Sequence, residues 1–404
     1  MTTTLQESQT HTNRSTGRLK VGLAFMAFIL IGANDGAFGV LLPSVQAHYH
    51  IDKSTVGLLF LASVVGYFAA SFNTGLLVEK LGNRLFLVVS TMIYALGAGF
   101  ISLMPPFLFA PFAYLFIGFG IAMMDAGLNA YIAGLPKNTA LLNYLHAFYG
   151  VGAWLGPVAA SSILAIQFGW NAVYWLWGGL SLLLLFSFAA FFRKQITSGQ
   201  AVAKSESNLM TSTLKLRVVW LAAFFLLFYV GAEVSLGSWS YSFLTEERHG
   251  LPLLSGWIVS GYWLGLTLGR ATLGKVAQMV GNKRMIQGCL AGVVVGIVLT
   301  WLAPNQVVAA IGLWLTGFSL GPIFPTTIAL MSNLVTGRVL PSAIGFLASL
   351  GSAGAALFPW LAGNLAEHLG LWSLFPYVIV LTIVMLALWI TLQRQPTATA
   401  EQIS

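Results

Sequence analysis

The sequence predicts an all-α membrane protein whose twelve transmembrane helices form two pseudo-symmetric bundles of six helices. Hydrophobic residues make up 57% of the 404 residues and charged residues only 7%, whereas about a quarter of a soluble domain is charged. Apolar runs long enough to cross a bilayer recur along nearly the whole chain. These runs must form helices, because backbone groups in lipid have to satisfy their hydrogen bonds within the segment.

The positions of the apolar runs give the expected spans. They cover residues 19–46, 55–79, 84–103, 107–134, 140–167, 171–192, 216–244, 254–278, 283–302, 306–333, 340–367 and 371–392. The one long hydrophilic interruption indicates a linker between two halves. We therefore expect a disordered cytoplasmic tail over residues 1–18, six-helix bundles over 19–192 and 216–392, a cytoplasmic linker over 193–215 and a second cytoplasmic tail over 393–404.

Basic residues gather on one side of the predicted membrane. With the N-terminus inside, sixteen of them fall in cytoplasmic segments, whereas only Lys53 and Arg248 fall outside and Arg270 lies within a span. This distribution follows the positive-inside rule. It predicts a multi-pass protein of an inner or plasma membrane, surrounded by the lipid bilayer, with both termini in the cytoplasm. Bilayer topology thus explains the net charge of +8, and we expect no nucleic-acid partner.

Short patterns recur in the two halves at an almost constant offset. Gly75-LLVEKL-Gly82-Asn83 matches Gly274-KVAQMV-Gly281-Asn282, and Gly118-Phe119 matches Gly317-Phe318, each pair 199 residues apart. Asp35 in the first span has Glu233 in the seventh span as its counterpart, at an offset of 198. Two parallel six-helix repeats, each with an acid in its first helix, are typical of secondary transporters.

Three acidic residues lie within predicted spans, namely Asp35, Asp125 and Glu233. A charged group at that depth costs at least a few kcal/mol and is normally functional. Because an apolar environment favours the neutral form of a carboxyl group, each acid is a candidate proton-coupling site. The alternative is a carboxylate permanently paired inside the bundle. Glu233 can also bind a substrate hydroxyl or a cation, and Tyr229, one turn before it, is expected to face the same way.

Neutral polar residues and a histidine accompany Asp125. Asn129 follows it by one helical turn on the same face. After a short loop come Asn143 and His146, again about one turn apart. These asparagines and Asn34 either bridge helices or bind ligand hydroxyl groups. His146 is either a structural residue beside Asn143, or a group that titrates near neutral pH and gates the cytoplasmic side.

Arg270 shares one face of the eighth span with Trp263 and Thr267. Its long side chain either extends to the membrane interface or forms a conformation-dependent ion pair with Asp125. Trp263 and Trp239 fall near the expected cavity. Each can stack on a sugar ring, and packing between helices is the alternative role.

These patterns resemble those of the major facilitator superfamily. Gly75-x-x-x-Glu79-x-x-Gly82-Asn83-Arg84 is similar to the signature loop between helices two and three, which makes Glu79 and Arg84 candidate ion-pair or gating residues. Three segments resemble the fucose–proton symporter branch and its glucose-transporter-like relatives: Ala33-Asn34-Asp35-Gly36, Asp125-x-x-x-Asn129 with Leu142-Asn143-x-x-His146, and Tyr229-Val230-Gly231-Ala232-Glu233.

The resemblance implies two halves that rock about a central cavity, with proton coupling through Asp35 and Asp125. We expect a monomer that takes up a neutral sugar or similar polyhydroxylated small molecule together with protons, by alternating access; sodium is the alternative coupling ion. Gly152-x-x-x-Gly156-Pro157 resembles an antiporter signature, so proton-coupled export of a drug or metabolite is the first alternative, although the same glycines suit helix packing. A non-transporting sensor and a lipid flippase are further alternatives.

The sequence contains no Walker loop, zinc-ligand spacing or nucleophile elbow. We therefore expect no enzymatic activity, no catalytic residues, no metal site and no cofactor.

Overall fold

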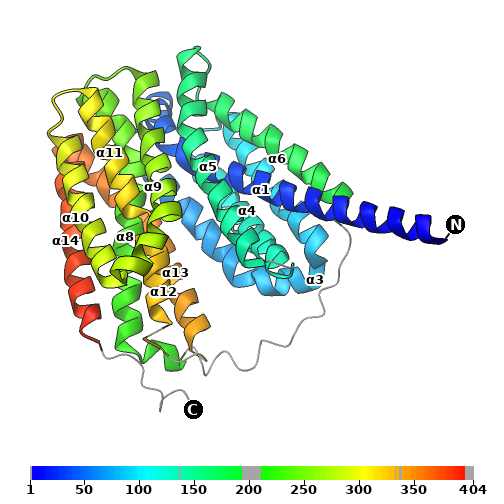
Figure 1. Cartoon of the computed structure of the whole chain (residues 1–404). Helices are drawn as coiled ribbons and strands as arrows, with labels where there is room; N and C mark the ends of the chain where they lie inside the picture. Colours follow the sequence, from blue (N-terminus) through cyan, green and yellow to red (C-terminus); the bar gives the residue numbers. More distant parts are fainter. Residues whose placement is uncertain (1, 136–137, 193–210, 333, 336–338, 396–404) are drawn as a thin grey trace.

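A computed structural model of the chain describes residues 2–135, 138–192, 211–332, 334–335 and 339–395. These residues form helices joined by short connections, and none of them lies in a β-strand. Figure 1 shows two groups of helices that lie side by side. Residues 193–210, most of the expected linker, and 396–404 of the second tail lie outside the described residues.

The first group comprises α1 (Thr2–Tyr49), α2 (Lys53–Val56), α3 (Leu58–Ser102), η1 (Phe107–Phe109), α4 (Ala110–Ala133), α5 (Asn138–Ala165) and α6 (Asn171–Phe191). The second comprises α8 (Arg217–Ser242), η2 (Phe243–Glu247), α9 (Pro252–Val280), α10 (Asn282–Trp301), α11 (Gln306–Leu320), α12 (Ile323–Met331), α13 (Leu340–Leu369), η3 (Leu371–Ser373) and α14 (Leu374–Gln393).

The expected spans are recovered in these helices. Among the described residues, 11 helical segments are long and apolar enough to cross a membrane, and α9, with 29 residues, takes the place of the eighth expected span. α3 contains the second and third spans, and α11 and α12 together form the tenth. α1 begins at Thr2, upstream of the expected start, and its membrane-length part is Gly17–Tyr49.

Backbone geometry reproduces the internal repeat. Gly82 inside α3 and Gly281 between α9 and α10 have φ angles of 68° and 84°, in a region that glycine enters readily. Gly118 packs against the backbone oxygen of Ser63, and Gly317 packs against that of Tyr262. Ser63 and Tyr262 are themselves 199 residues apart. The two groups therefore share both a glycine with positive φ at matching positions and a helix–helix contact.

Glycines bring α1 and α5 close together. A methyl group at Gly152 would overlap the backbone oxygen of Ile29, and one at Gly156 would overlap that of Ala33. Gly32 of α1 approaches the backbone of Tyr149 in the same way. Small residues of this kind allow two helix backbones to touch. The contact places the next turn of α1 beside the side chain of Tyr149.

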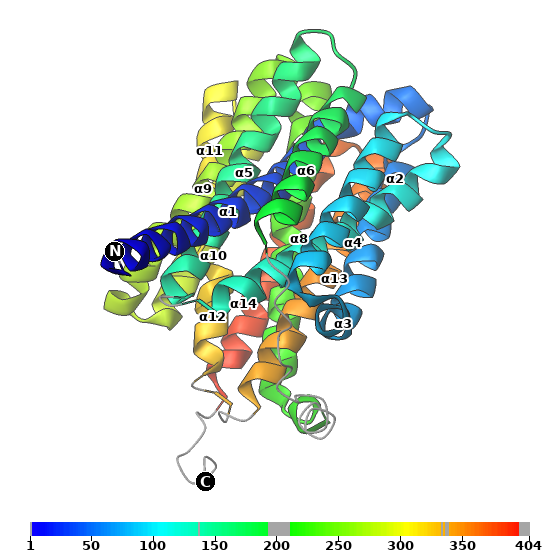
Figure 2. The same cartoon turned by 90° about the vertical axis from the view of Figure 1, so that its right-hand side faces the viewer.

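The two groups touch at the end of the molecule opposite the C-terminus (Figures 1 and 2). The Nζ of Lys53 lies 2.9 Å from Oε2 of Glu246, and the backbone N–H of Lys53 donates to Oε2 of Glu367 at 2.9 Å. Gly57 lies against the ring of Trp360. We call these contacts the closed seam. Toward the C-terminus the helices of the two groups spread apart (Figure 1).

Candidate functional site

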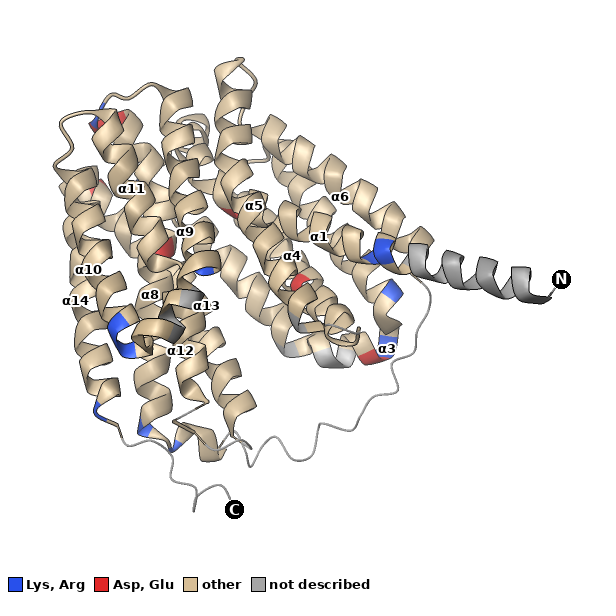
Figure 3. Ribbon diagram, in the orientation of Figure 1, with Lys and Arg blue, Asp and Glu red and all other residues tan. Residues whose placement is uncertain are grey.

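A cavity of about 540 Å³ lies between the two groups of helices, within the range of small-molecule sites. Its walls come from α1, α3, α4 and α5 on one side and from α8, α9, α12 and α13 on the other. Charged residues are few within the helices (Figure 3). The cavity lining gathers the expected polar residues Asn34, Asp35, Asp125, His146, Glu233, Trp263 and Arg270.

Asp35 of α1 accepts hydrogen bonds from neutral groups. The Oη of Tyr149 donates to its Oδ2 at 2.9 Å, and the Nδ2 of Asn34 donates to its Oδ1 at 3.2 Å. Tyr94 in turn donates to Oδ1 of Asn34 at 3.2 Å. The amide of Asn34 is therefore fixed by two neighbours, one of which is the carboxylate.

Asp125 of α4 has a similar environment. The Oη of Tyr67 donates to its Oδ2 at 3.2 Å. The Nδ2 of Asn129 donates to its Oδ1 at 2.8 Å and to its backbone oxygen at 3.0 Å. Asn129, which we expected to bind substrate, is not among the cavity-lining residues. One helical turn away from Asp125, it holds the carboxylate in place.

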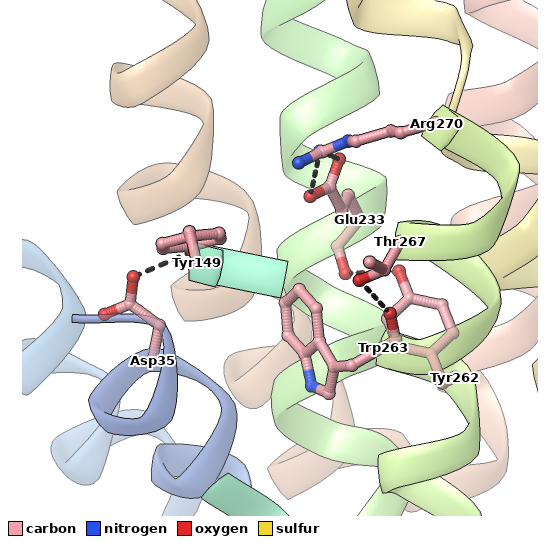
Figure 4. A network of polar contacts seen from close by, with 7 residues as sticks. All are labelled: Asp35, Tyr149, Glu233, Tyr262, Trp263, Thr267 and Arg270. Carbon is pink, nitrogen blue, oxygen red and sulfur yellow. Dashed lines mark hydrogen bonds and ion pairs between the residues drawn. The ribbon is translucent and has the colours of Figure 1, made fainter. Parts of the chain in front are cut away.

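Glu233 of α8 differs from both aspartates because it has a cationic partner. The Nη2 of Arg270 lies 3.1 Å from Oε1 and 3.4 Å from Oε2 of Glu233. Tyr262 fixes the same turn of α8 by donating to the backbone oxygen of Glu233 at 2.8 Å. Figure 4 shows this pair across the cavity from Asp35 and Tyr149. The opposite charges stabilise each other's ionised form.

The partner of Arg270 differs from the one we expected. From the sequence, Arg270 either reaches the membrane interface or pairs with Asp125 in one conformation, whereas this structure pairs it with Glu233. The pairing of Glu233 with a cation was one of the roles considered for that acid. The physical reason is that α8 packs against α9, whereas α4, which carries Asp125, packs mainly against α3. Glu79 and Arg84 are exposed beside the Gly82 kink, and neither forms an ion pair with another described residue.

Three other expected binding residues are not among those that line the cavity. Trp239 is fully buried and donates from Nε1 to the backbone oxygen of Pro359 at 2.8 Å. Tyr229 is also fully buried, and Asn143 is exposed without lining the cavity. The rotation of each helix about its own axis decides which of its residues face the cavity. The spacing of residues along the sequence does not determine this rotation.

Trp263 and His146 do line the cavity. Trp263 packs on Tyr262, with ring centroids 5.3 Å apart, and its own ring blocks any side chain at Gly237. His146 meets the ring of Phe28 edge-on at 5.6 Å. Both side chains therefore rest on aromatic neighbours at the cavity wall.

The sequence reasoning missed the tyrosines that contact the two aspartates. Tyr67 and Tyr149 each donate a hydrogen bond to one of them. A signal was present for Tyr149, because it follows His146 by three residues and so shares its helix face. Tyr67 carried no comparable signal, since tyrosine is common in membrane helices for other reasons.

Comparison with known proteins gives a consistent picture at the level of family. Residues 24–278 and 235–403 match the model of the Major Facilitator Superfamily. "Bypass of stop codon protein 6" of Saccharomyces cerevisiae is 25% identical in an alignment 413 residues long, gaps included. The alignment covers 92% of this chain and 81% of that protein. The glucose/mannose transporter GlcP of Bacillus subtilis is 22% identical over 383 residues, which cover 91% and 90%.

Solved structures share the fold. The crystal structure of the nucleoside transporter NupG superposes with a TM-score of 0.76 at 13% identity, covering 93% of this chain and 98% of that chain. The Escherichia coli fucose:proton symporter FucP superposes with a TM-score of 0.61 at 16% identity, covering 92% and 98%. At these identities the similarity concerns the arrangement of helices.

Proposed function

Because the chain belongs to the major facilitator superfamily, a family of transporters and not of enzymes, we propose that it is a proton-coupled symporter. The substrate is a neutral sugar or a similar polyhydroxylated small molecule, taken up by alternating access in the central cavity. The sequence patterns indicated the same superfamily, and the family match confirms that expectation.

The observation that carries the proposal is the contrast between the three membrane acids. Asp35 and Asp125 accept hydrogen bonds from tyrosine and asparagine side chains, and neither forms an ion pair with another described residue. A carboxyl group in that setting gains from binding a proton. We assign the transported protons to these two residues. We leave Glu233 out of proton coupling, because Arg270 already compensates its charge.

The internal repeat supports this division of roles. Arg270 has its counterpart in the first half at Ser71, 199 residues earlier. The Oγ of Ser71 donates to the backbone oxygen of Tyr67 at 2.8 Å. The first repeat therefore lacks a cation where the second repeat has one, and the acid of its first helix, Asp35, is left with neutral partners.

A hydroxylated substrate is supported by the relatives and by the cavity. GlcP is named as a glucose/mannose transporter and FucP as a fucose:proton symporter. The cavity wall offers carboxyl, amide and guanidinium groups at Asp35, Asn34 and Arg270, and such groups form hydrogen bonds with sugar hydroxyls. The exporter alternative relied on Gly152 and Gly156, whose close packing against α1 accounts for both glycines.

The expected membrane orientation also assigns a conformational state to this structure. With both termini in the cytoplasm, the closed seam faces outward and the cavity belongs to the inward-open state of the transport cycle. The outward-open state then requires separation of Lys53 from Glu246 and Glu367.

Radiolabelled hexose uptake into proteoliposomes tests the proposal. Asp35→Asn and Asp125→Asn should each abolish accumulation driven by an inward proton gradient, yet retain exchange of internal for external hexose, because only the proton site is lost. Glu79→Gln, which alters an exposed acid, should accumulate hexose like the unaltered protein. Gradient-driven accumulation that survives in both aspartate variants would exclude these residues as the coupling sites.

A further inference from the structure

The ion pair between Arg270 and Glu233 has hydrogen-bonding capacity left over. Both hydrogen bonds to Glu233 come from Nη2 of Arg270, although a guanidinium carries five donor hydrogens on three nitrogens. Nε of Arg270 is buried and has no hydrogen-bond partner. The side chains of Arg270 and Glu233 are 35% and 11% exposed, and both line the cavity. The pair is therefore reachable by a solute.

Neighbouring groups hold the pair in position. Tyr262 bonds to the backbone of Glu233, and Thr267 bonds to the backbone oxygen of Trp263 at 2.9 Å. Trp263 lines the cavity, and its buried indole N–H has no partner. In Figure 4 the indole, the carboxylate and the guanidinium come from two adjacent helices on one wall. On this wall the partly exposed guanidinium of Arg270 presents donors beside the carboxylate acceptor.

A sugar hydroxyl matches such a wall because it both donates and accepts hydrogen bonds. One hydroxyl can accept from the guanidinium while its neighbour donates to the carboxylate. A carboxylate on the solute would instead be held beside Glu233, and an ammonium group would be held beside Arg270. Like charges brought together at a desolvated site discriminate strongly against the wrong ligand.

We propose that Arg270 and Glu233 form a subsite that binds two hydroxyl groups of a hexose, and that their mutual charge balance makes the transporter select neutral sugars over charged analogues. This assignment rests on the proposed function, which supplies the hydroxylated substrate. It gives Arg270 a role in specificity in place of the expected gating pair. Glu233 acts there as a hydroxyl acceptor and takes no part in proton coupling.

Three sugars of the same ring but different charge provide the test: glucose, the anion glucuronate and the cation glucosamine. Equilibrium binding of each to the purified full-length protein is measured at about pH 6, where the acid is ionised and the amine protonated. The unaltered protein should prefer glucose by about tenfold or more over both charged sugars. Glu233→Gln leaves Arg270 unbalanced and should shift the preference toward glucuronate by about tenfold. Arg270→Gln should shift it toward glucosamine by a similar factor.

Each single variant leaves one charge of the ion pair without its partner, which can disturb folding. Two further variants therefore keep the test decisive. The double variant Arg270→Gln/Glu233→Gln removes both charges and should lose the discrimination between the three sugars. Glu246→Gln removes the other ion pair, at the closed seam, and should keep the original ranking. An unchanged ranking in all cavity variants, with glucose still bound, would overturn the subsite and leave the proposed transport of sugar intact. Failure of the unaltered protein to bind any of the three sugars would instead overturn the hexose substrate, and the subsite with it.

Discussion

Removing the two carboxylates that hold Lys53 should open the side of the molecule that is closed in this structure. Glu246 pairs with the Nζ of Lys53, and Glu367 accepts from its backbone N–H, both at 2.9 Å. Both glutamates belong to the second helix group and Lys53 to the first. Replacing both by alanine in Glu246→Ala/Glu367→Ala therefore removes polar contacts that join the two groups only while the seam is closed.

The expected effect follows from the exposure of these contacts. The side chains of Lys53 and Glu246 are 20% and 36% exposed, so their pair contributes about 0.2–1 kcal/mol, as exposed ion pairs do. A hydrogen bond to a charged group contributes about 1.5–3 kcal/mol, and we take the lower part of that range because Glu367 is exposed. A total of about 2–3 kcal/mol changes the ratio of seam-open to seam-closed molecules roughly 30- to 150-fold.

Distances between spin labels on the two groups measure this ratio. Labels at Ile166→Cys and Leu302→Cys sit at exposed positions near the closed seam, each 66% exposed, while the single native cysteine, Cys289, is buried. The alanine double variant should populate a longer distance than the unaltered protein. Glu247→Ala, at the exposed neighbour of Glu246, should leave the distribution unchanged. A shift of less than about twofold in the double variant would refute the assignment of the seam.

Two further predictions concern the contact of α1 with α5. Gly152→Ala should lower the melting temperature, because the added methyl group meets the backbone of Ile29 and such overpacking costs about 1–3 kcal/mol of folding stability. Gly179→Ala places its methyl group in open space and should leave the melting temperature unchanged. Tyr149→Phe removes a hydrogen bond to Asp35 worth at least about 1.5 kcal/mol, so proton-driven hexose uptake should slow by roughly tenfold while hexose exchange persists. Equal melting temperatures for the two alanine variants, or equal loss of uptake and exchange in Tyr149→Phe, would contradict these expectations.

The fold was largely accessible from the sequence because the bilayer restricts it to few choices. Long apolar runs have to be helices, and their lengths have to match the membrane. The repeated glycines also carried correct structural information. Gly82 and Gly281, matched in sequence, both adopt positive φ, and Gly118 and Gly317 make equivalent contacts.

The cavity could be predicted only in part. Intramembrane charge identified Asp35, Asp125, Glu233 and Arg270, all of which line the cavity. The choice of partner for Arg270 depended on which helix lies next to α9, and that neighbour is decided by tertiary packing. Helical periodicity relates residues on one helix, so it could not reveal the hydrogen bond from Tyr149 of α5 to Asp35 of α1.

The three-dimensional arrangement separated two tryptophans that the sequence treated alike. Trp239 and Trp263 occur in adjacent spans and had equal claims to a sugar-stacking role. Trp239 is held inside its own helix group by Pro359, whereas Trp263 reaches the cavity wall. Both are almost fully buried, so only the three-dimensional arrangement distinguishes them.

The most direct measurement of the central claim is the internal pH of proteoliposomes when a hexose is added outside in the absence of any imposed gradient. Proton-coupled symport predicts acidification of the lumen with glucose or a related neutral sugar, and loss of that signal in Asp125→Asn. A lumen that stays at constant pH with every neutral sugar would contradict symport. If the lumen then becomes alkaline when a cationic or apolar compound is added instead, the result would favour proton-coupled export.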